Sequence, residues 1–413
     1  MRNTNNNFMI SLYIISLTFA FTTRYGDYRI GFELQMLIGA FWIIIALLNF
    51  LINGRTFKSK LGSDFKWLIK LYLTPHIVIH LYTIILMIVG KVDWNYFTSN
   101  VTVYIPTLLS IVSIYLFGTK AFEYTFIALI ASWLLSVISS MLMKGPAIFL
   151  HAILQAYINP NDTTGGLIVN YLELHDLVLA IGYILVFYVF SSSKLLTKKK
   201  FITLTSTLLV IGLGMKRVTL VALVLVLIFH ALTRTLSDYK RYKLCLLAGW
   251  FAFIVCYLFI FVLSKGNEFY DFVANHGINV MGRNYYYQAI MRYAEFRPTF
   301  IGIGRNVVTR ILNNELSYLK VGGVHSDIIK MYVENGFIMF GLWLWYYLIY
   351  VTKQYRKRYG NSEAILYFSL VIYTFTLYLT DNIEVYFICQ IFSILIPATY
   401  ALERKRQDYY LKE

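Results

Sequence analysis

The sequence is poor in charge, cysteine and proline. Charged residues make up 14% of its 413 residues and hydrophobic residues 58%, whereas a soluble domain carries ~25% charged and ~45–50% apolar residues. With six prolines and 24 glycines, the chain is neither disordered nor fibrous. Cys245, Cys256 and Cys389 lie far apart in apolar segments, which excludes a disulfide framework and a zinc cluster. The composition therefore predicts a protein embedded in a membrane.

Long polar stretches are also scarce. A helix needs about 20 apolar residues to cross a bilayer, and shorter ones suffice where the bilayer thins. We therefore predict an all-α fold, a polytopic membrane protein with about 12 transmembrane helices in one integral membrane domain, residues 1–413. The predicted spans are 8–23, 36–52, 67–89, 101–118, 121–143, 175–193, 201–215, 218–233, 244–264, 328–350, 364–380 and 385–402.

Segments 201–215 and 218–233 are short and could form one long helix. That helix would put the basic clusters 198–200 and 234–243 on opposite sides of the membrane. Cytoplasmic loops carry an excess of Lys and Arg, so this arrangement is disfavoured. We predict instead a hairpin whose tip carries Lys216 and Arg217.

Acidic residues number 21 against 37 basic ones, a net charge of +16. In a soluble chain this excess would indicate nucleic acid, but here most basic residues fall in alternate connections. The positive-inside rule then places both termini in the cytoplasm. We expect the chain to lie in the cytoplasmic (inner) membrane. The first span follows a start with a single charge and lacks a small-residue cleavage site, so it is predicted to be retained.

Two outward segments are longer than a connection requires. Segment 144–174 opens with Gly145-Pro146 and an apolar stretch, which predicts a short helix in the membrane interface. Segment 265–327 is predicted to be a large extracellular catalytic loop. It carries five arginines: Arg283, Arg292, Arg297, Arg305 and Arg310.

Arginine binds phosphate bidentately and keeps its charge. The five arginines therefore indicate a phosphate-bearing ligand reached from the outer leaflet, together with Lys216 and Arg217 at the hairpin tip. The alternative is that they pair with nearby acids and lipid headgroups.

The segment Gly322-Gly323-Val324-His325-Ser326-Asp327 precedes a long aromatic span. Paired glycines permit a tight turn, which would bring His325 to the start of a helix. An imidazole there can take a proton from an attacking hydroxyl, and Asp327 could hold the ring. The alternative is a histidine satisfied by backbone groups.

Other polar and aromatic residues allow more than one interpretation. Tyr285 and Tyr286 follow Arg283 and could stack on a saccharide or simply pack. Asp381 and Glu384 could pair with loop arginines, line an acceptor groove or be solvated. His76 and His80 have metal-ligand spacing but no acidic or cysteine partner in their span, so burial or hydrogen bonding between helices is favoured.

These features together resemble the O-antigen polymerase and ligase superfamily. The resemblance covers the topology of the whole chain and the motifs of about 210–385. The matching residues are Lys216-Arg217, Arg283 with its aromatics, Pro298 through Gly302-Ile303-Gly304, His325-Ser326-Asp327, Glu334-Asn335-Gly336 and Tyr378 through Asn382. His175-Asp176 lacks the Pro and Asn of a further family motif.

The resemblance implies a GT-C-like glycosyltransferase that polymerises polyprenyl-diphosphate-linked oligosaccharide repeat units at the outer face of the membrane, for capsule, exopolysaccharide or O-antigen. Undecaprenyl diphosphate is the expected leaving group, without metal or other cofactor. Expected partners are membrane lipids, a flippase and a chain-length regulator, and not nucleic acid. The site residues assigned on this basis are His325, Arg283, Arg305 and Asp327 for catalysis, Lys216, Arg217, Arg292 and Arg310 for the diphosphate, and Tyr285, Tyr286 and Glu334 for the saccharide.

Two alternatives stay open. A ligase uses the same kind of donor with a different acceptor. A flippase or transporter of lipid-linked oligosaccharide would move its substrate without forming a glycosidic bond, although carriers usually show repeated halves and binding sites at mid-membrane.

Overall fold

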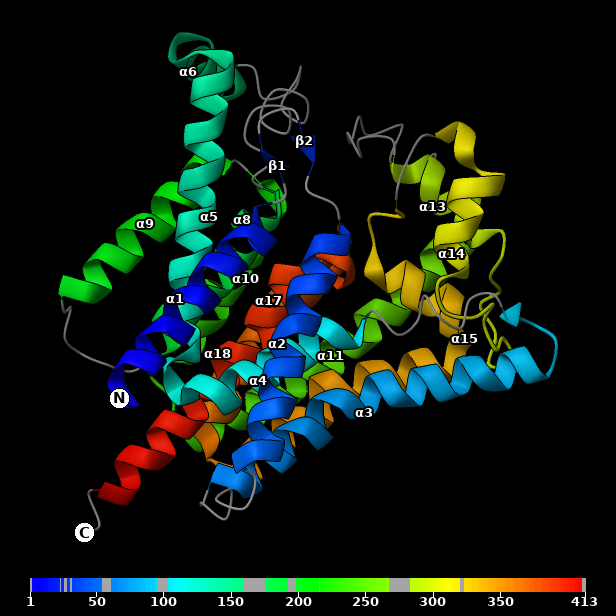
Figure 1. Ribbon diagram of the computed structural model, residues 1–413. Coiled ribbons are helices and arrows are strands. Elements are labelled where there is room, and N and C mark those ends of the chain that lie inside the picture. The colour runs from blue at the N-terminus through cyan, green and yellow to red at the C-terminus, as the bar shows by residue number, and fades with distance from the viewer. Residues whose placement is uncertain are drawn as a thin grey trace. The chain divides into compact units, whose positions relative to one another are not determined.

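The computed structural model is built almost wholly from helices (Figure 1). It describes residues 2–22, 24–25, 28–29, 32–53, 61–94, 103–158, 175–191, 198–214, 216–266, 283–319 and 323–410. Within them, the extended elements are β1 (Arg24–Tyr25) and β2 (Tyr28–Arg29), an antiparallel pair of two residues each. The predicted all-α class is confirmed.

The chain forms two compact units. The first contains residues 1–68, 105–227 and 386–413. Its helices are α1 (Arg2–Phe21), α2 (Phe32–Asn53), α4 (Tyr104–Phe117), α5 (Ala121–Lys144), α6 (Pro146–Ile158), α8 (His175–Phe190), α9 (Lys198–Gly214), most of α10 (Arg217–Thr233) and α18 (Phe387–Tyr410).

In the first unit, α1 packs along α5, and α8 packs on α9 and α18 (Figure 1). Buried hydroxyls join these apolar helices. Tyr13 of α1 donates to Ser113 Oγ at 2.8 Å and lies 2.9 Å from Thr125 Oγ1. Such side-chain bonds give otherwise interchangeable apolar surfaces a definite register.

The second unit contains residues 69–104 and 228–385. It holds most of α3 (Leu61–Ile88), α11 (Asp238–Ser264), α13 (Arg283–Met291), α14 (Val307–Arg310), α15 (Asp327–Trp345), α16 (Val351–Arg358) and α17 (Asn361–Tyr378). Short π and 3-10 turns complete it: η5 (Ile311–Glu315), η6 (Ser317–Leu319), η7 (Tyr346–Tyr350) and η8 (Ile383–Val385).

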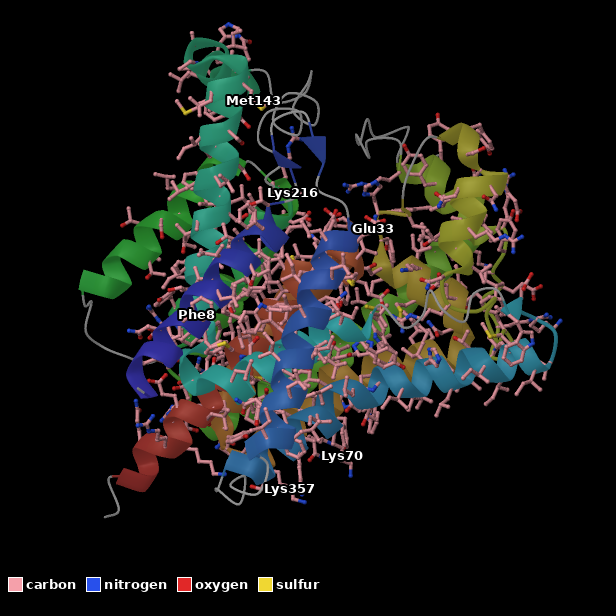
Figure 2. The ribbon with its side chains drawn as sticks, in the orientation of Figure 1. Phe8, Glu33, Lys70, Met143, Lys216 and Lys357 are labelled. Carbon is pink, nitrogen blue, oxygen red and sulfur yellow. The ribbon has the colours of Figure 1, made fainter. Side chains whose placement is uncertain are left out.

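In the second unit, α11 crosses the π turn η7 at Gly249. A Cβ there would lie 2.8 Å from Ile349 Cδ1 and 3.0 Å from the Leu348 carbonyl oxygen, so the small residue sets the distance between the elements. At one end of this unit, Tyr72 and Tyr355 hydroxyls meet at 2.7 Å. Lys70 and Lys357 of this unit are seen near the bottom of Figure 2.

Four described segments are long and apolar enough to cross a membrane: Glu33–Ile52, Ser63–Ile88, Tyr104–Met143 and Asp238–Ser264. These helices suggest a multi-pass membrane protein. The third includes two predicted spans, joined through the 3-10 turn η4 (Gly118–Lys120). The helices α8, α9 and α10 are apolar but shorter. The separation of α9 from α10 confirms the predicted break, whereas the full set of twelve spans stays a prediction.

The two long outward segments contain helices of their own. The helix predicted after Gly145 is α6, beginning at Pro146 as expected of a proline at the first helical position. The predicted loop 265–327 contains α13, α14, η5 and η6. Residues 159–174, 267–282 and 320–322 of these segments lie outside the described residues.

Candidate functional site

Two glycines let the chain cross its own backbone in the second unit. Helix α15 is interrupted at Gly336, whose φ is +76°, and the segment before Arg305 lies against the break. The N–H groups of Ile303 and Gly304 donate to the carbonyls of Val333 and Glu334 at 3.0 and 2.8 Å. The carbonyl groups left without helical partners at the break thus accept hydrogen bonds from another segment of the chain, as buried backbone groups require.

Each glycine occupies space that the other's side chain would need. A Cβ on Gly302, where φ is +82°, would lie 2.5 Å from the Glu334 carbonyl oxygen and 2.6 Å from Gly336 N. A Cβ on Gly336 would overlap the backbone of Ile301. The crossing brings two sequence motifs together and fixes Arg305 and Glu334, which flank it, in the same interior.

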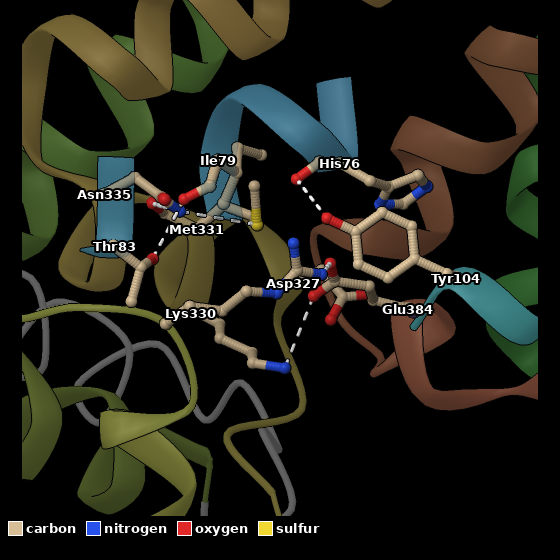
Figure 3. A network of polar contacts seen from close by, with 10 residues as sticks. His76, Ile79, Thr83, Tyr104, Asp327, Lys330, Met331, Asn335 and Glu384 are labelled. Atoms are coloured by element: carbon tan, nitrogen blue, oxygen red, sulfur yellow. Dashed lines mark hydrogen bonds and ion pairs between the residues drawn. The ribbon is translucent and has the colours of Figure 1, made fainter. Parts of the chain in front are cut away.

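Arg305 is buried there in an ion pair. Its guanidinium Nη2 lies 2.6 Å from Glu384 Oε1, and its side chain is 2% exposed. Lys330 Nζ lies 3.3 Å from the other oxygen of the same carboxylate (Figure 3). One acid thus holds two cations, although the Nη1 atom of Arg305 makes no hydrogen bond within the described residues.

Glu384 is kept ionised by these cations. Burial alone would raise the pKa of this carboxyl, but the charges of Arg305 and Lys330 outweigh burial and lower the pKa to about 2. Glu384 lies in η8, just beyond α17. Of the three interpretations of this acid in the sequence, pairing with a loop arginine is the one the structure shows.

Asp327 and Glu334 add two more buried carboxyls. Both are 1% exposed, and with Lys330 they follow the spacing that puts residues on one helical face. Asp327 Oδ2 accepts the Glu384 backbone N–H at 2.8 Å. Burial, and next the charge of Glu384, raise the pKa of Asp327 well above its ordinary value. Neither oxygen of Glu334 makes a hydrogen bond of normal geometry within the described part of the chain.

Helix α3 borders this charge cluster of Arg305, Lys330, Glu384, Asp327 and Glu334. His76, near the middle of α3, lies within electrostatic range of the cluster's Arg305 and Glu384 (Figure 3). Its carbonyl accepts the Tyr104 hydroxyl at 3.2 Å. The His76 side chain is half-buried there.

His325 lies in the turn before α15. It has a left-handed backbone with φ +54°, uncommon for a residue with a side chain, and its side chain is 36% exposed. Its Nδ1 lies 3.9 Å from Asp381 Oδ1. Asp381, rather than the predicted Asp327, is therefore the carboxylate that faces the imidazole.

Neighbouring residues hold this turn. Ser326 caps α15 by accepting the Ile329 N–H at 3.3 Å, as serine commonly does at a helix start. The Tyr287 hydroxyl donates to the His325 carbonyl at 2.9 Å, and burial raises the pKa of Tyr287 to about 12. The Tyr286 ring lies 6.5 Å from the His325 ring. The strained turn is thus held from α13, α15 and α17.

The remaining predicted site residues lie at differing exposures. Arg283 begins α13 and is half-buried, whereas Arg292 and Arg310 are exposed. Tyr285 is 64% exposed. Arg297 forms an exposed ion pair with Glu295 at 2.5 Å. Among these, Arg283 and Tyr286 share a helix with Tyr287, which contacts the His325 turn.

Lys216 and Arg217 belong to the first unit. Lys216 lies at the N-terminal end of α10 (Figure 2), where its carbonyl accepts the Thr219 N–H at 3.0 Å. Arg217, the first residue of α10, is exposed. Their assignment to the diphosphate stays a prediction.

Sequence reasoning missed Lys330 altogether and gave Asp381 and Glu384 no definite role. A lysine in the first turn of an apolar helix is a signal for a buried partner, because an unpaired charge there is costly. The partner itself, 54 residues away, has no local signature.

No family model matches this chain, and no curated protein matches its sequence. The function is therefore inferred from the geometry of the site. Its features are the partly exposed His325 beside Asp381, the half-buried Arg283 on α13, and the buried charge cluster around Arg305.

Proposed function

We propose that this protein polymerises polyprenyl-diphosphate-linked oligosaccharide repeat units at the outer face of the cytoplasmic membrane. One observation carries the proposal: motifs scattered over 283–382 converge in the second unit. Gly302 crosses Gly336, the Asp327 N–H donates to the Asp381 carbonyl at 3.3 Å, and His325 faces Asp381. These are the motifs by which the sequence resembles O-antigen polymerases and ligases.

The reaction proposed is a glycosyl transfer. An acceptor hydroxyl attacks the anomeric carbon of the donor saccharide while the bond from that carbon to the diphosphate oxygen breaks. The polyprenyl diphosphate leaves with the bonding electrons, and the hydroxyl proton passes to His325, which Asp381 orients. Because the leaving group is already activated, no nucleotide sugar is required.

The arginines stabilise the charge that develops on the diphosphate. Arg283, half-buried on α13, is the arginine proposed to contact it, and the exposed Arg292 and Arg310 of the same unit are proposed to assist. The assignment of Lys216 and Arg217 to the diphosphate stays a prediction from the sequence. Arg305 is paired with Glu384 and its side chain is 2% exposed, so it is not proposed to contact the substrate. Its proposed role is to hold a buried positive charge near the site. Tyr285 and Tyr286 present aromatic faces to a saccharide.

The deciding experiment uses the purified full chain in detergent with one defined lipid-linked repeat unit. A ladder of multiples, resolved by electrophoresis or mass spectrometry, supports a polymerase. A single transfer to an unrelated acceptor supports a ligase. Movement of the lipid-linked repeat across vesicles without a longer product supports a flippase and overturns the proposal.

A variant series connects the reaction to the site. Arg283→Ala is expected to reduce ladder formation at least 10-fold, since removing one group that stabilises developing charge costs about 10²–10³ in rate in a well-formed site. Arg297→Ala is the matched control, because this arginine is exposed and paired with Glu295. Equal loss in both variants would remove Arg283 from the site.

A further inference from the structure

An apolar groove with a volume of about 550 Å³ lies in the second unit, outside the charged site. One wall is formed by α11 through Phe253, Tyr257 and Phe261. The other is formed by Phe296 and Phe337, whose ring centroids lie 5.5 Å apart. The two sets of rings are in contact, with centroids 4.9 Å apart for Tyr257 and Phe337 and 5.2 Å apart for Phe261 and Phe296, so together they form a continuous aromatic surface along the groove.

The one polar atom among these rings is turned out of the groove. The Tyr257 hydroxyl donates to the Phe337 carbonyl at 2.7 Å, a group next to the break at Gly336. Gly341 makes room for this hydroxyl, since a Cβ there would overlap it. Among the described residues that line the groove, no side chain therefore offers water or a polar ligand a free hydrogen-bonding group.

The groove opens where lipid would be expected. Helix α11 is one of the segments able to cross a membrane, and Ile254 and Leu258 at the groove are 54% and 53% exposed. In a bilayer, only a hydrocarbon chain can occupy such a space.

A cation lies at one end of the groove. Lys265, at the C-terminal end of α11, holds its Nζ 5.0 Å from the centre of the Phe261 ring. A chain lying along α11 would thus carry its head toward a positive charge, which selects an anionic headgroup such as a phosphate.

The groove and the charged site share a wall. Phe337 directly follows Gly336, and its N–H donates to the Phe300 carbonyl at 2.8 Å. Phe296 stacks near Tyr332, in the part of α15 that carries Lys330 and Glu334. A lipid in the groove therefore lies against the same broken helix that supports the charge cluster.

We infer that this groove binds the isoprenoid chain of a polyprenyl-phosphate lipid, with the phosphate end toward Lys265. The inference rests on the proposed function and assigns the hydrophobic part of its substrate. Methyl-branched isoprene units lying along this aromatic surface would gain contact area and dispersion attraction.

The test is binding of undecaprenyl diphosphate, without any saccharide, to the purified full chain in detergent, followed by native mass spectrometry. Leu258→Trp fills the groove and is expected to weaken binding at least 10-fold. Leu247→Trp is the matched control, because Leu247 lies on α11, is 65% exposed and does not line the groove. Lys265→Gln, which leaves the groove walls unchanged, is expected to weaken binding several-fold and guards against misfolding of the first variant.

The outcomes separate this inference from the proposed function. Unchanged binding in a folded Leu258→Trp protein overturns the groove assignment, as does displacement of undecaprenyl diphosphate by an equal amount of phosphatidylglycerol. If the Leu258→Trp protein makes the ladder at the wild-type rate, the proposed polymerase activity is retained and the groove assignment is rejected. Groove-dependent binding with no saccharide product leaves the groove standing without the polymerase.

Discussion

Gly302 and Gly336 cross with their backbones in contact, each in the place where the other's side chain would lie. The crossing joins the part of the outward loop between α13 and α14 to the interior of α15. Both glycines have positive φ, so a side chain at either position meets backbone strain and steric overlap together. The position of Arg305, three residues beyond Gly302, follows from this crossing.

Alanine at Gly302 is expected to destabilise the protein strongly. The left-handed backbone alone costs about 1–2 kcal/mol for a residue with a Cβ, and overpacking adds about 1–3 kcal/mol. Gly90→Ala is the control, since φ there is +72° with nothing within 4 Å of the added Cβ. Thermal unfolding in detergent should show a clearly larger decrease in Tm for Gly302→Ala than for Gly90→Ala. Equal losses would mean that the crossing relaxes without cost.

Glu384→Gln is expected to cost about 3–5 kcal/mol, because it leaves the buried guanidinium of Arg305 without its anion. Glu295→Gln is the control: it breaks an ion pair of similar length whose side chains are about 60% exposed, and exposed pairs contribute about 0–1 kcal/mol. Comparable losses in the two variants would contradict the burial assigned to Arg305.

The same variant carries a pH signature. The pKa of Glu384 is lowered to about 2 from an ordinary value of 4.5, so its stabilisation is full above pH 4.5 and is lost as pH falls from 4.5 to about 2. The stability gap between wild type and Glu384→Gln should therefore narrow over that range. A gap that does not change with pH would show that the carboxylate is not charged in the folded protein.

Asp327→Asn is expected to stabilise the protein, in contrast to Glu384→Gln, which is expected to destabilise it. The folded-state pKa of Asp327 is raised, so ionisation of this carboxyl opposes folding as pH rises above its ordinary value of 3.8. Asparagine keeps an oxygen to accept the Glu384 N–H and cannot ionise. The variant should therefore have a larger free energy of unfolding than wild type at pH 7, and this advantage should fade as the pH falls below 3.8. Denaturation at both pH values measures it; destabilisation at pH 7 would refute it.

His325→Asn separates chemistry from folding. Asparagine tolerates the left-handed backbone of this turn better than most residues. The free energy of unfolding should therefore change by less than about 0.5 kcal/mol. Loss of a general base is expected to reduce ladder formation about 100-fold or more. Wild-type rates in a folded His325→Asn protein would exclude the imidazole from the reaction.

Local patterns in the sequence predicted the helices well. The run 364–380 lies mostly within α17, α9 and α10 are separated near Lys216 and Arg217, and α15 begins at Asp327, so His325 lies at the start of a helix as expected. Each of these follows from apolar spacing and end signals within a few residues of the element. Interruptions within a helix were harder to predict. Hydropathy gives no sign of the break at Gly336, because this glycine lies inside an apolar run.

The candidate site was predicted only in outline. His325 and Arg283 were found because a polar residue beside glycines or aromatics is conspicuous in an apolar chain. The carboxylates that face His325 and Arg305 were not assigned, because Asp381 and Glu384 lie 56 and 79 residues beyond them and any acid in range would serve equally. Which residues meet is decided by the backbone crossing, a contact between glycines that leaves no pattern in hydrophobicity or charge.

The ion pair of Arg305 with Glu384 also has a consequence for biosynthesis. The 79 residues between them take several seconds to translate at about 5–20 residues per second. During that interval, the arginine has no Glu384 and is costly to bury in an apolar interior. The loop that carries it can settle only after the chain has been extended past α17. Completion of the chain through Glu384 is thus a condition for Arg305 to be buried as an ion pair.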